Sequence, residues 1–267
     1  MAYRIKEVAE MMGITPQTLR FYEQYGMCSY SRGGEGGYRS YSGANVDVLM
    51  SLRNLRNCGY GVAQAVELLR CPDILRQSRL LREQAQKLAR QIEMQRRIVE
   101  KLRERAQWME EAPARIGIIE ERMRPAALMR VFAADREERM LPKERAEMAR
   151  WTDWMPLLQW GRILDAGRGC KTTRQGFVVD PETAAFLEIG DTPGLIRLPA
   201  QPCLYAVLSW RPQKKELDGQ VAALLERARA QGKALGEEAL VRTFWNVGLT
   251  HQQSYGEVWI PVEGRSN

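Results

Sequence analysis

The sequence is poor in the residues that most enzymes and metal sites require. It contains one histidine, His251, and its five cysteines form no C-x-x-C pair. A single imidazole excludes most histidine-based catalysis and most zinc sites, because these combine His with other ligands or partners. The cysteines are expected to be reduced thiols with mainly structural roles: Cys28, Cys58, Cys71, Cys170 and Cys203. We therefore expect no metal, no cofactor and no catalytic residues.

Long apolar runs are also absent. No stretch of about 18 consecutive apolar residues occurs, and the first ten residues, MAYRIKEVAE, lack the apolar core of a signal peptide. Hydrophobic residues make up 45% of the chain and charged residues 27%, which is typical of a globular protein. The expected location is the cytoplasm, with no membrane partner.

A strongly basic segment is missing as well. The net charge is +7 for the whole chain. Residues 1–75 contain eight basic and seven acidic residues, and residues 76–111 contain ten basic and six acidic residues. Charge alone is therefore a weak indication of nucleic-acid binding, since a basic solvated face is common.

Residues 1–72 are predicted to form short helices around a glycine-rich loop. Apolar residues recur at helical spacing from Ile5 to Met12, and Gly13 ends that helix. Thr15 is a suitable N-cap followed by Pro16, so a second helix is expected to run to about Tyr25. The tight turn between these helices predicts a helix-turn-helix. The loop 31-SRGGEGGYRSYS-42 predicts a two-stranded wing, and further helices are expected at 43–57 and 61–70.

Several side chains of this segment have the chemistry that DNA recognition needs. Small polar residues on the outward face of the second helix suit base edges in the major groove, whereas Arg and Tyr suit backbone phosphates. Leu19 and Phe21 are expected to face the core instead. The candidate DNA contacts are Thr15, Gln17, Thr18, Arg20 and Tyr22 on the helix, and Tyr38, Arg39 and Tyr41 on the wing.

Residues 73–111 carry the most regular pattern of the chain. Steps of four and three join Leu81, Ala85, Leu88, Ile92, Gln95, Val99, Leu102, Ala106 and Met109. This a/d seam of about four heptads predicts a coiled coil that pairs two copies of the chain, ended by Pro113. The alternative is a long helix packed on its own domain.

Residues 112–267 mix strand-like and helix-like periods. Helices are expected at about 141–158 and 218–231. Strands are expected at 114–123, 126–133, 175–180, 185–190, 203–210 and 255–262. Together with the first two segments, this order predicts an α+β multidomain protein whose third domain has an antiparallel sheet.

The last predicted strand presents a carboxylate between two aromatic rings. Tyr255, Glu257 and Trp259 share one face by period two. Rings and a carboxylate attract a lipophilic cation, with about 0.5–2 kcal/mol from each cation–π contact. The alternative is that both rings cover the sheet while Glu257 faces an arginine or the solvent.

The N-terminal residues resemble the MerR family of transcription regulators. The pattern I-x-E-V-A, then G-I-T-x-x-T-L-R-x-Y-E and G-Y-R-x-Y, is carried by Ile5–Glu10, Gly13–Glu23 and Gly37–Tyr41. The resemblance implies a winged helix-turn-helix homodimer on double-stranded promoter DNA, which distorts an over-long spacer for RNA polymerase when an effector binds. It implies an activator. Metal-sensing relatives carry Cys near the end of the dimer helix, but residues 101–125 have none, which argues against a metal sensor.

The third segment resembles the GyrI-like, BmrR-type effector-binding domain of multidrug-sensing MerR relatives. The resemblance is carried by 198-LPAQPCLYAVLSW-210, Asp218-Gly219 and 257-EVWIPV-262. It implies two β-α-β-β units around a pocket that contains Glu257 and Trp259. The resemblance would place a second acid near Phe244 or Trp245, but this chain has aromatic residues there instead. The further ligand candidates are Tyr255, Phe244, Trp245, Tyr205, Trp151 and Trp154.

The expected effector is a small aromatic or lipophilic compound, and a cationic compound of this kind is one of the alternatives. Three other interpretations stay open: a sensor of a neutral apolar metabolite, a hydrolase that uses Glu257 with Tyr255 or Tyr205, and an architectural DNA binder without a ligand.

Overall fold

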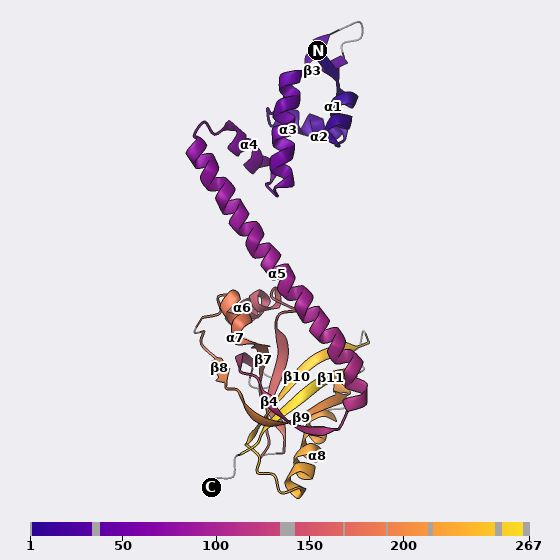
Figure 1. Ribbon diagram of the computed structural model, residues 1–267, viewed down its shortest axis with the longest axis vertical. Helices are drawn as coiled ribbons and strands as arrows, with labels where there is room; N and C mark the ends of the chain where they lie inside the picture. The colour runs from indigo at the N-terminus through magenta and orange to yellow at the C-terminus, as the bar shows by residue number, and fades with distance from the viewer. Residues whose placement is uncertain are drawn as a thin grey trace. The chain divides into compact units, whose positions relative to one another are not determined.

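The computed structural model describes residues 2–33, 38–133, 142–167, 169–190, 192–212, 216–248 and 253–263. The chain forms two compact units, Met1–Gln95 and Arg96–Asn267, whose elements are shown in Figure 1. Residues 34–37 of the predicted wing and the first residue of the helix predicted at 141–158 lie outside the described residues. None of the described helices combines the length and apolar character that a membrane span requires.

The N-terminal unit is a helix-turn-helix with a small sheet. Its elements are β1 (Ala2–Arg4), α1 (Ile5–Met12), α2 (Pro16–Gln24), β2 (Ser31–Gly33), β3 (Tyr38–Ser42), α3 (Gly43–Asn57) and α4 (Val62–Arg70). The sheet order is β1-β3-β2, so the predicted wing gains a third strand that the sequence did not indicate. Gly13 adopts φ 60°, which ends α1, and the Thr15 side chain accepts a hydrogen bond from the backbone N–H of Thr18, which starts α2.

Helix α5 (Ile74–Arg115) is one continuous helix of 42 residues. The expectation that Pro113 ends it is wrong, because the helix continues to Arg115 with Pro113 in its last turn. Proline has no N–H to donate to the carbonyl of Met109, so one hydrogen bond of the preceding turn is lost, but the backbone can keep its helical path to Arg115. The predicted seam is exposed at Leu81, Ile92, Val99, Leu102 and Met109. A neighbouring side of the helix buries Ala112 and packs Trp108 against the core of the C-terminal unit.

The C-terminal unit contains an eight-stranded sheet in the order β4-β9-β11-β10-β6-β7-β5-β8, with all neighbours antiparallel. Two β-α-β-β units build it, β5-α6-β6-β7 and β9-α8-β10-β11, and they meet at the β10–β6 pair. The strands are β4 (Ile119–Arg124), β5 (Ala127–Ala133), β6 (Gln159–Asp165), β7 (Lys171–Val179), β8 (Leu195–Leu198), β9 (Gln201–Trp210), β10 (Glu238–Val247) and β11 (Gln253–Pro261). The helices are α6 (Pro142–Thr152), α7 (Pro181–Phe186) and α8 (Glu216–Ala230). The predicted antiparallel α+β domain is confirmed.

The strand predicted at 185–190 is wrong, and three strands were not predicted. Residues 181–186 form α7, because Asp180 caps the helix through the Thr183 N–H and Pro181 takes its first position. Strands β6, β8 and β10 were missed. The helix predicted at 141–158 ends at Thr152, which leaves room for the turn before β6.

Alternation along the strands separates two faces of this sheet. Leu204, Ala206 and Leu208 of β9 join the cluster that includes Val221 of α8. Tyr205 and its neighbours on the other face join the cluster that packs Trp108 of α5. Helices α5 and α8 therefore cover opposite faces of the same strands.

Glycine substitutions test this packing. A Cβ at Gly176 of β7 would overlap the backbone carbonyl of Arg130 on β5, whereas a Cβ at Gly219 of α8 meets nothing within 4 Å. We expect Gly176→Ala to lower the free energy of unfolding by about 1–3 kcal/mol. The matched Gly219→Ala should raise it by about 0.5–1 kcal/mol, because alanine is the better helix former. Urea unfolding followed by tryptophan fluorescence measures both, since all seven tryptophans lie in the C-terminal unit. Equal effects of the two substitutions would contradict the β5–β7 pairing.

Candidate functional site

The start of helix α2 presents two free polar side chains on one face. Gln17 and Arg20 are exposed, three residues apart, and no hydrogen-bond or ion-pair partner for either lies among the described residues. Thr15 and Thr18 are engaged with each other instead. Their hydroxyl oxygens are 2.9 Å apart, and the Thr18 N–H donates to Thr15 Oγ1 at 3.1 Å. Gln17 and Arg20 are therefore the side chains of this helix that are available to a partner.

Two predicted contacts are corrected by burial. Tyr22 and Tyr41 are 7% and 0% exposed and belong to the core of the unit, so their rings cannot lie on a DNA-facing surface. Tyr22 lies three residues after the buried Leu19, on the same side of α2. Phe21, expected in the core, is 43% exposed.

Glu23 joins the wing to helix α2. The Tyr41 hydroxyl donates to Glu23 Oε1, and Arg39 Nε lies 3.6 Å from Glu23 Oε2. Burial is the main reason that the pKa of Tyr41 is raised, and the nearby Glu23 carboxylate adds to it. The Arg39 guanidinium also lies 4.4 Å from the centre of the Tyr30 ring. The sequence analysis missed Glu23 as a positioning residue, although its spacing to Leu19 and Tyr22 marks the same side of the helix.

The wing thus offers Tyr38 and Arg39. Tyr38 is 69% exposed, and Arg39 is partly exposed and held by Glu23. With Gln17 and Arg20 they form the polar surface of the N-terminal unit that we call the α2–wing surface.

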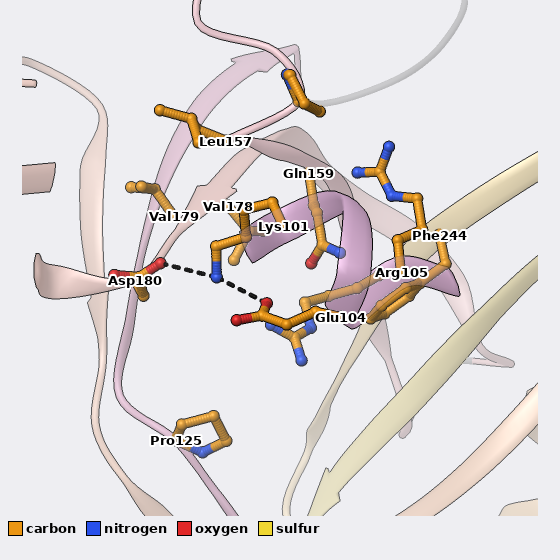
Figure 2. A pocket seen from close by; sticks show the side chains of 12 residues that line it. Lys101, Glu104, Arg105, Pro125, Leu157, Gln159, Val178, Val179, Asp180 and Phe244 are labelled. Atoms are coloured by element: carbon orange, nitrogen blue, oxygen red, sulfur yellow. Dashed lines mark hydrogen bonds and ion pairs between the residues drawn. The ribbon is translucent and has the colours of Figure 1, made fainter. Parts of the chain in front are cut away.

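The C-terminal unit contains a cavity of about 260 Å³ between α5 and the sheet (Figure 2). Its apolar lining comes from prolines, aliphatic residues and Phe244 on β10. The residues around it are Lys101, Glu104, Arg105, Pro125, Pro156, Leu157, Gln159, Val178, Val179, Asp180, Arg242 and Phe244. Three of them are cations and two are anions, so this α5 pocket is not the acidic site that a cationic effector would suggest.

Lys101 is neutralised inside the α5 pocket. Its Nζ lies 3.5 Å from Asp180 Oδ2 and 2.9 Å from Glu104 Oε2, and Figure 2 shows it between the two carboxylates. Asp180 also accepts from the Thr183 N–H at 2.7 Å. Burial raises the pKa of Asp180, but the hydrogen bonds from Thr183 and the Lys101 charge outweigh it and lower that pKa overall. Asp180 is therefore held as an anion with its partners in place.

Glu257 is buried and already paired. It is 3% exposed, and its Oε1 accepts from Arg242 Nε and from Trp259 Nε1, both at 2.6 Å. Arg242 and Glu257 face each other directly in the β10–β11 register. The expectation of a carboxylate open to a cation is corrected, and the structure matches the alternative in which Glu257 faces an arginine.

Of the eight predicted ligand residues, Phe244 is the one that lines the α5 pocket. Its ring stacks on Trp108 of α5, with centroids 4.3 Å apart and planes 13° from parallel. Tyr205 and Trp259 are buried beside each other on the same face of the sheet, with centroids 4.6 Å apart. Burial and the Glu257 charge raise the pKa of Tyr205.

The other four candidates do not join them. Trp151 is 4% exposed and stacks on Phe177, which neighbours the pocket residue Val178 on β7 and therefore faces the other side of the sheet. Trp154 packs on Trp151. Trp245 is 42% exposed, and neither it nor Tyr255 lines the α5 pocket.

The sequence analysis missed the charged residues of the α5 pocket. Lys101, Arg105, Trp108 and Ala112 recur at steps of four, three and four, on a side of the helix about a quarter turn from the seam. This second stripe was a usable signal that the last turns of α5 pack on a domain.

The N-terminal segment matches a known family. Residues 3–71 match the model of the MerR HTH family regulatory protein. The chain is 37% identical over 67 residues to the HTH-type transcriptional regulator ZntR of Escherichia coli (strain K12), covering 25% of this chain and 48% of that protein. It is 33% identical over 69 residues to the mercuric resistance operon regulatory protein of Bacillus cereus, covering 26% and 52%. The chain thus spans about half the length of the curated relatives it matches. Residues 3–71 of the N-terminal unit therefore match the helix-turn-helix of MerR-type regulators.

A solved structure is similar over a larger part of the chain. It is the crystal structure of a transcriptional regulator of the MerR family from Bacillus cereus, with 18% identity over 58% of this chain and 98% of that chain, and a TM-score of 0.38. A score this low does not assign the C-terminal unit to a fold family, so the GyrI-like assignment stays a prediction.

Removing the guanidinium of Arg242 tests the buried pair. Arg242→Met leaves the Glu257 carboxylate buried without a counter-charge, and we expect a loss of about 3–5 kcal/mol in the free energy of unfolding. Adding Glu257→Gln should restore most of it. The control is Arg174→Met, which removes the exposed ion pair with Glu238 and should cost about 0–1 kcal/mol. Urea unfolding measures all three variants, and a loss no larger than that of the control would contradict the pairing.

Proposed function

We propose that this protein is a ligand-responsive transcription regulator that binds promoter DNA as a homodimer. The observation that carries the proposal is the MerR family match over residues 3–71, which falls on an intact helix-turn-helix with a wing. The long helix α5 and the separate C-terminal unit with its cavity supply the two other parts that such a regulator needs.

The α2–wing surface is the proposed DNA contact. Gln17 at the start of α2 reaches base edges in the major groove, whereas Arg20 and Arg39 bind backbone phosphates. Tyr38 extends from the wing toward the phosphate backbone. Glu23 holds Arg39 in place before DNA is met, so less side-chain entropy is lost on binding.

The seam of α5 is the proposed dimer contact. Ile92 is 69% exposed and Leu102 is 51% exposed, and both belong to a stripe that recurs at heptad spacing. An apolar stripe of this length gains most by pairing with the same stripe of a second copy. A symmetric dimer then presents two α2–wing surfaces to a pseudo-palindromic site.

The α5 pocket is the proposed effector site. Lys101, Glu104 and Arg105 line it from α5, and the seam residues Leu102 and Ala106 alternate with them along the same helix turns. If α5 can take two positions in the dimer, an effector that binds one of them more tightly shifts the equilibrium toward that state. In this proposal the shifted dimer distorts the promoter spacer, realigns it for RNA polymerase and activates transcription. The effector is a small compound with an aromatic part, since Phe244 lines the pocket and is held in place by its stacking on Trp108.

Arg20 tests the DNA contact. We expect Arg20→Ala to weaken binding to a duplex of arbitrary sequence by about tenfold, because a phosphate contact does not depend on the bases. The slope of log affinity against log salt should fall by about two, one for each protomer of the dimer. The control is Arg103→Ala, which removes an exposed arginine of the C-terminal unit. Fluorescence anisotropy at several salt concentrations measures both, and wild-type affinity in Arg20→Ala would remove this contact from the proposal.

The seam is tested by charges at two of its positions. Leu88→Lys with Ile92→Lys places two ammonium groups in each copy of the paired stripe, so we expect monomers in sedimentation equilibrium. The control, Gln86→Lys with Glu83→Gln, changes the net charge equally at exposed positions away from the seam. It should remain dimeric. Dimers of the seam variant would show that another surface pairs the chains.

A further inference from the structure

One cation of the α5 pocket has no counter-charge. Arg105 lines the cavity from α5, and its Nε is buried without a hydrogen-bond partner. No acidic partner of its guanidinium lies among the described residues. By contrast, Lys101 is paired with Asp180 and Glu104, and Arg242 is paired with Glu257. The acids at the pocket are thus committed to other cations.

A second arginine adds to this excess of positive charge. Arg124, at the end of β4, is 5% exposed, and its Nε is also buried without an acceptor. Its Nη2 donates to the carbonyl oxygen of Pro199 at 2.9 Å, which satisfies a hydrogen bond but not the charge. Burial lowers the pKa of Arg124, and the positive charge of Arg242 lowers it further. Two incompletely satisfied guanidinium groups therefore lie in the region that contains the α5 pocket.

A partly buried guanidinium whose Nε is shielded from water and has no partner is costly for the ligand-free protein. Burial lowers the pKa of Arg105, which is the mark of a cation that has lost water without gaining a partner. An incoming anion would repay that loss by accepting the free N–H groups, and the planar guanidinium matches a carboxylate in particular. A cation would meet repulsion there, and each acid that could attract it already has a partner.

The remaining wall is apolar and aromatic. Phe244 is fixed by its stacking on Trp108, and the aliphatic residues Leu157, Val178 and Val179 also line the cavity. A flat ring fits against such a surface with little loss of side-chain freedom.

We propose that the α5 pocket binds a small aromatic monocarboxylate, with the carboxylate on Arg105 and the ring beside Phe244. The proposal rests on the proposed effector role of this pocket and gives that effector a negative charge. The proposed effector is therefore an anion, whereas the sequence pattern of Tyr255, Glu257 and Trp259 suggested a cation.

The test compares three probes of one shape that differ in charge: 1-naphthoate, 1-naphthamide and 1-naphthylmethylammonium. Isothermal titration of the full chain should show 1-naphthoate binding at least tenfold more tightly than the amide, and no saturable binding of the ammonium compound. Arg105→Met should remove the preference for the carboxylate. The matched Arg103→Met, an exposed arginine on the same helix, should keep it.

Equal binding of the acid and the amide, preference for the ammonium compound, failure of every probe to saturate, or an unchanged preference in Arg105→Met would each overturn the proposal. Arg105→Gln is the second variant if Arg105→Met loses its near-ultraviolet circular dichroism, and it should lose the preference in the same way. DNA binding is measured separately by anisotropy. If the wild-type protein binds DNA but shows no preference for the carboxylate, this inference alone is rejected, whereas absent DNA binding in the wild-type protein would reject the proposed function.

Discussion

The two faces of helix α5 are the constraint on which the rest of the structure depends. Over its last turns, Lys101, Arg105 and Trp108 turn toward the sheet, while Leu102 and Met109 stay exposed on a neighbouring side. A single helix cannot bury both stripes in one copy of the C-terminal unit. The sheet takes the first stripe and closes the pocket with it, and the second stays exposed, which is why we propose it as the dimer contact. The residues that would bind a ligand and those that would bind a partner therefore share the same helical turns.

Pairing of charges, more than the presence of any one residue, decides what the α5 pocket accepts. Glu257 accepts from Arg242 across the β10–β11 pair, and Asp180 binds both Lys101 and the N–H of Thr183 at the start of α7. A buried carboxylate that is already paired attracts a new cation only weakly, because its existing partner cancels its charge. Breaking that pair would leave a desolvated charge without a partner, which is costly. Among the residues that line the pocket, the charge that the fold does not neutralise is that of Arg105.

Local signals made the N-terminal unit predictable, whereas the pocket depends on contacts that only the fold creates. Gly13, Thr15 and Pro16 mark the ends of α1 and α2 within the sequence itself, and the heptads of α5 are equally local. Which side of α2 faces the core was harder to predict, because a helix of nine residues shows little periodicity. Phe21 was expected in the core and Tyr22 at the surface, and the structure has the reverse. The pairing of Arg242 with Glu257 follows from the register of β10 against β11, and β10 was not recognised as a strand. A site whose charges are matched across strands cannot be read from one strand alone.

The most direct test of this account is native mass spectrometry of the intact wild-type chain at micromolar concentration. The account predicts a species of twice the 30.6 kDa of one chain, because the exposed stripe of α5 is covered by a second copy. A species of 30.6 kDa alone would contradict it, since the stripe would then stay in water and the α2–wing surfaces would have no twofold partner.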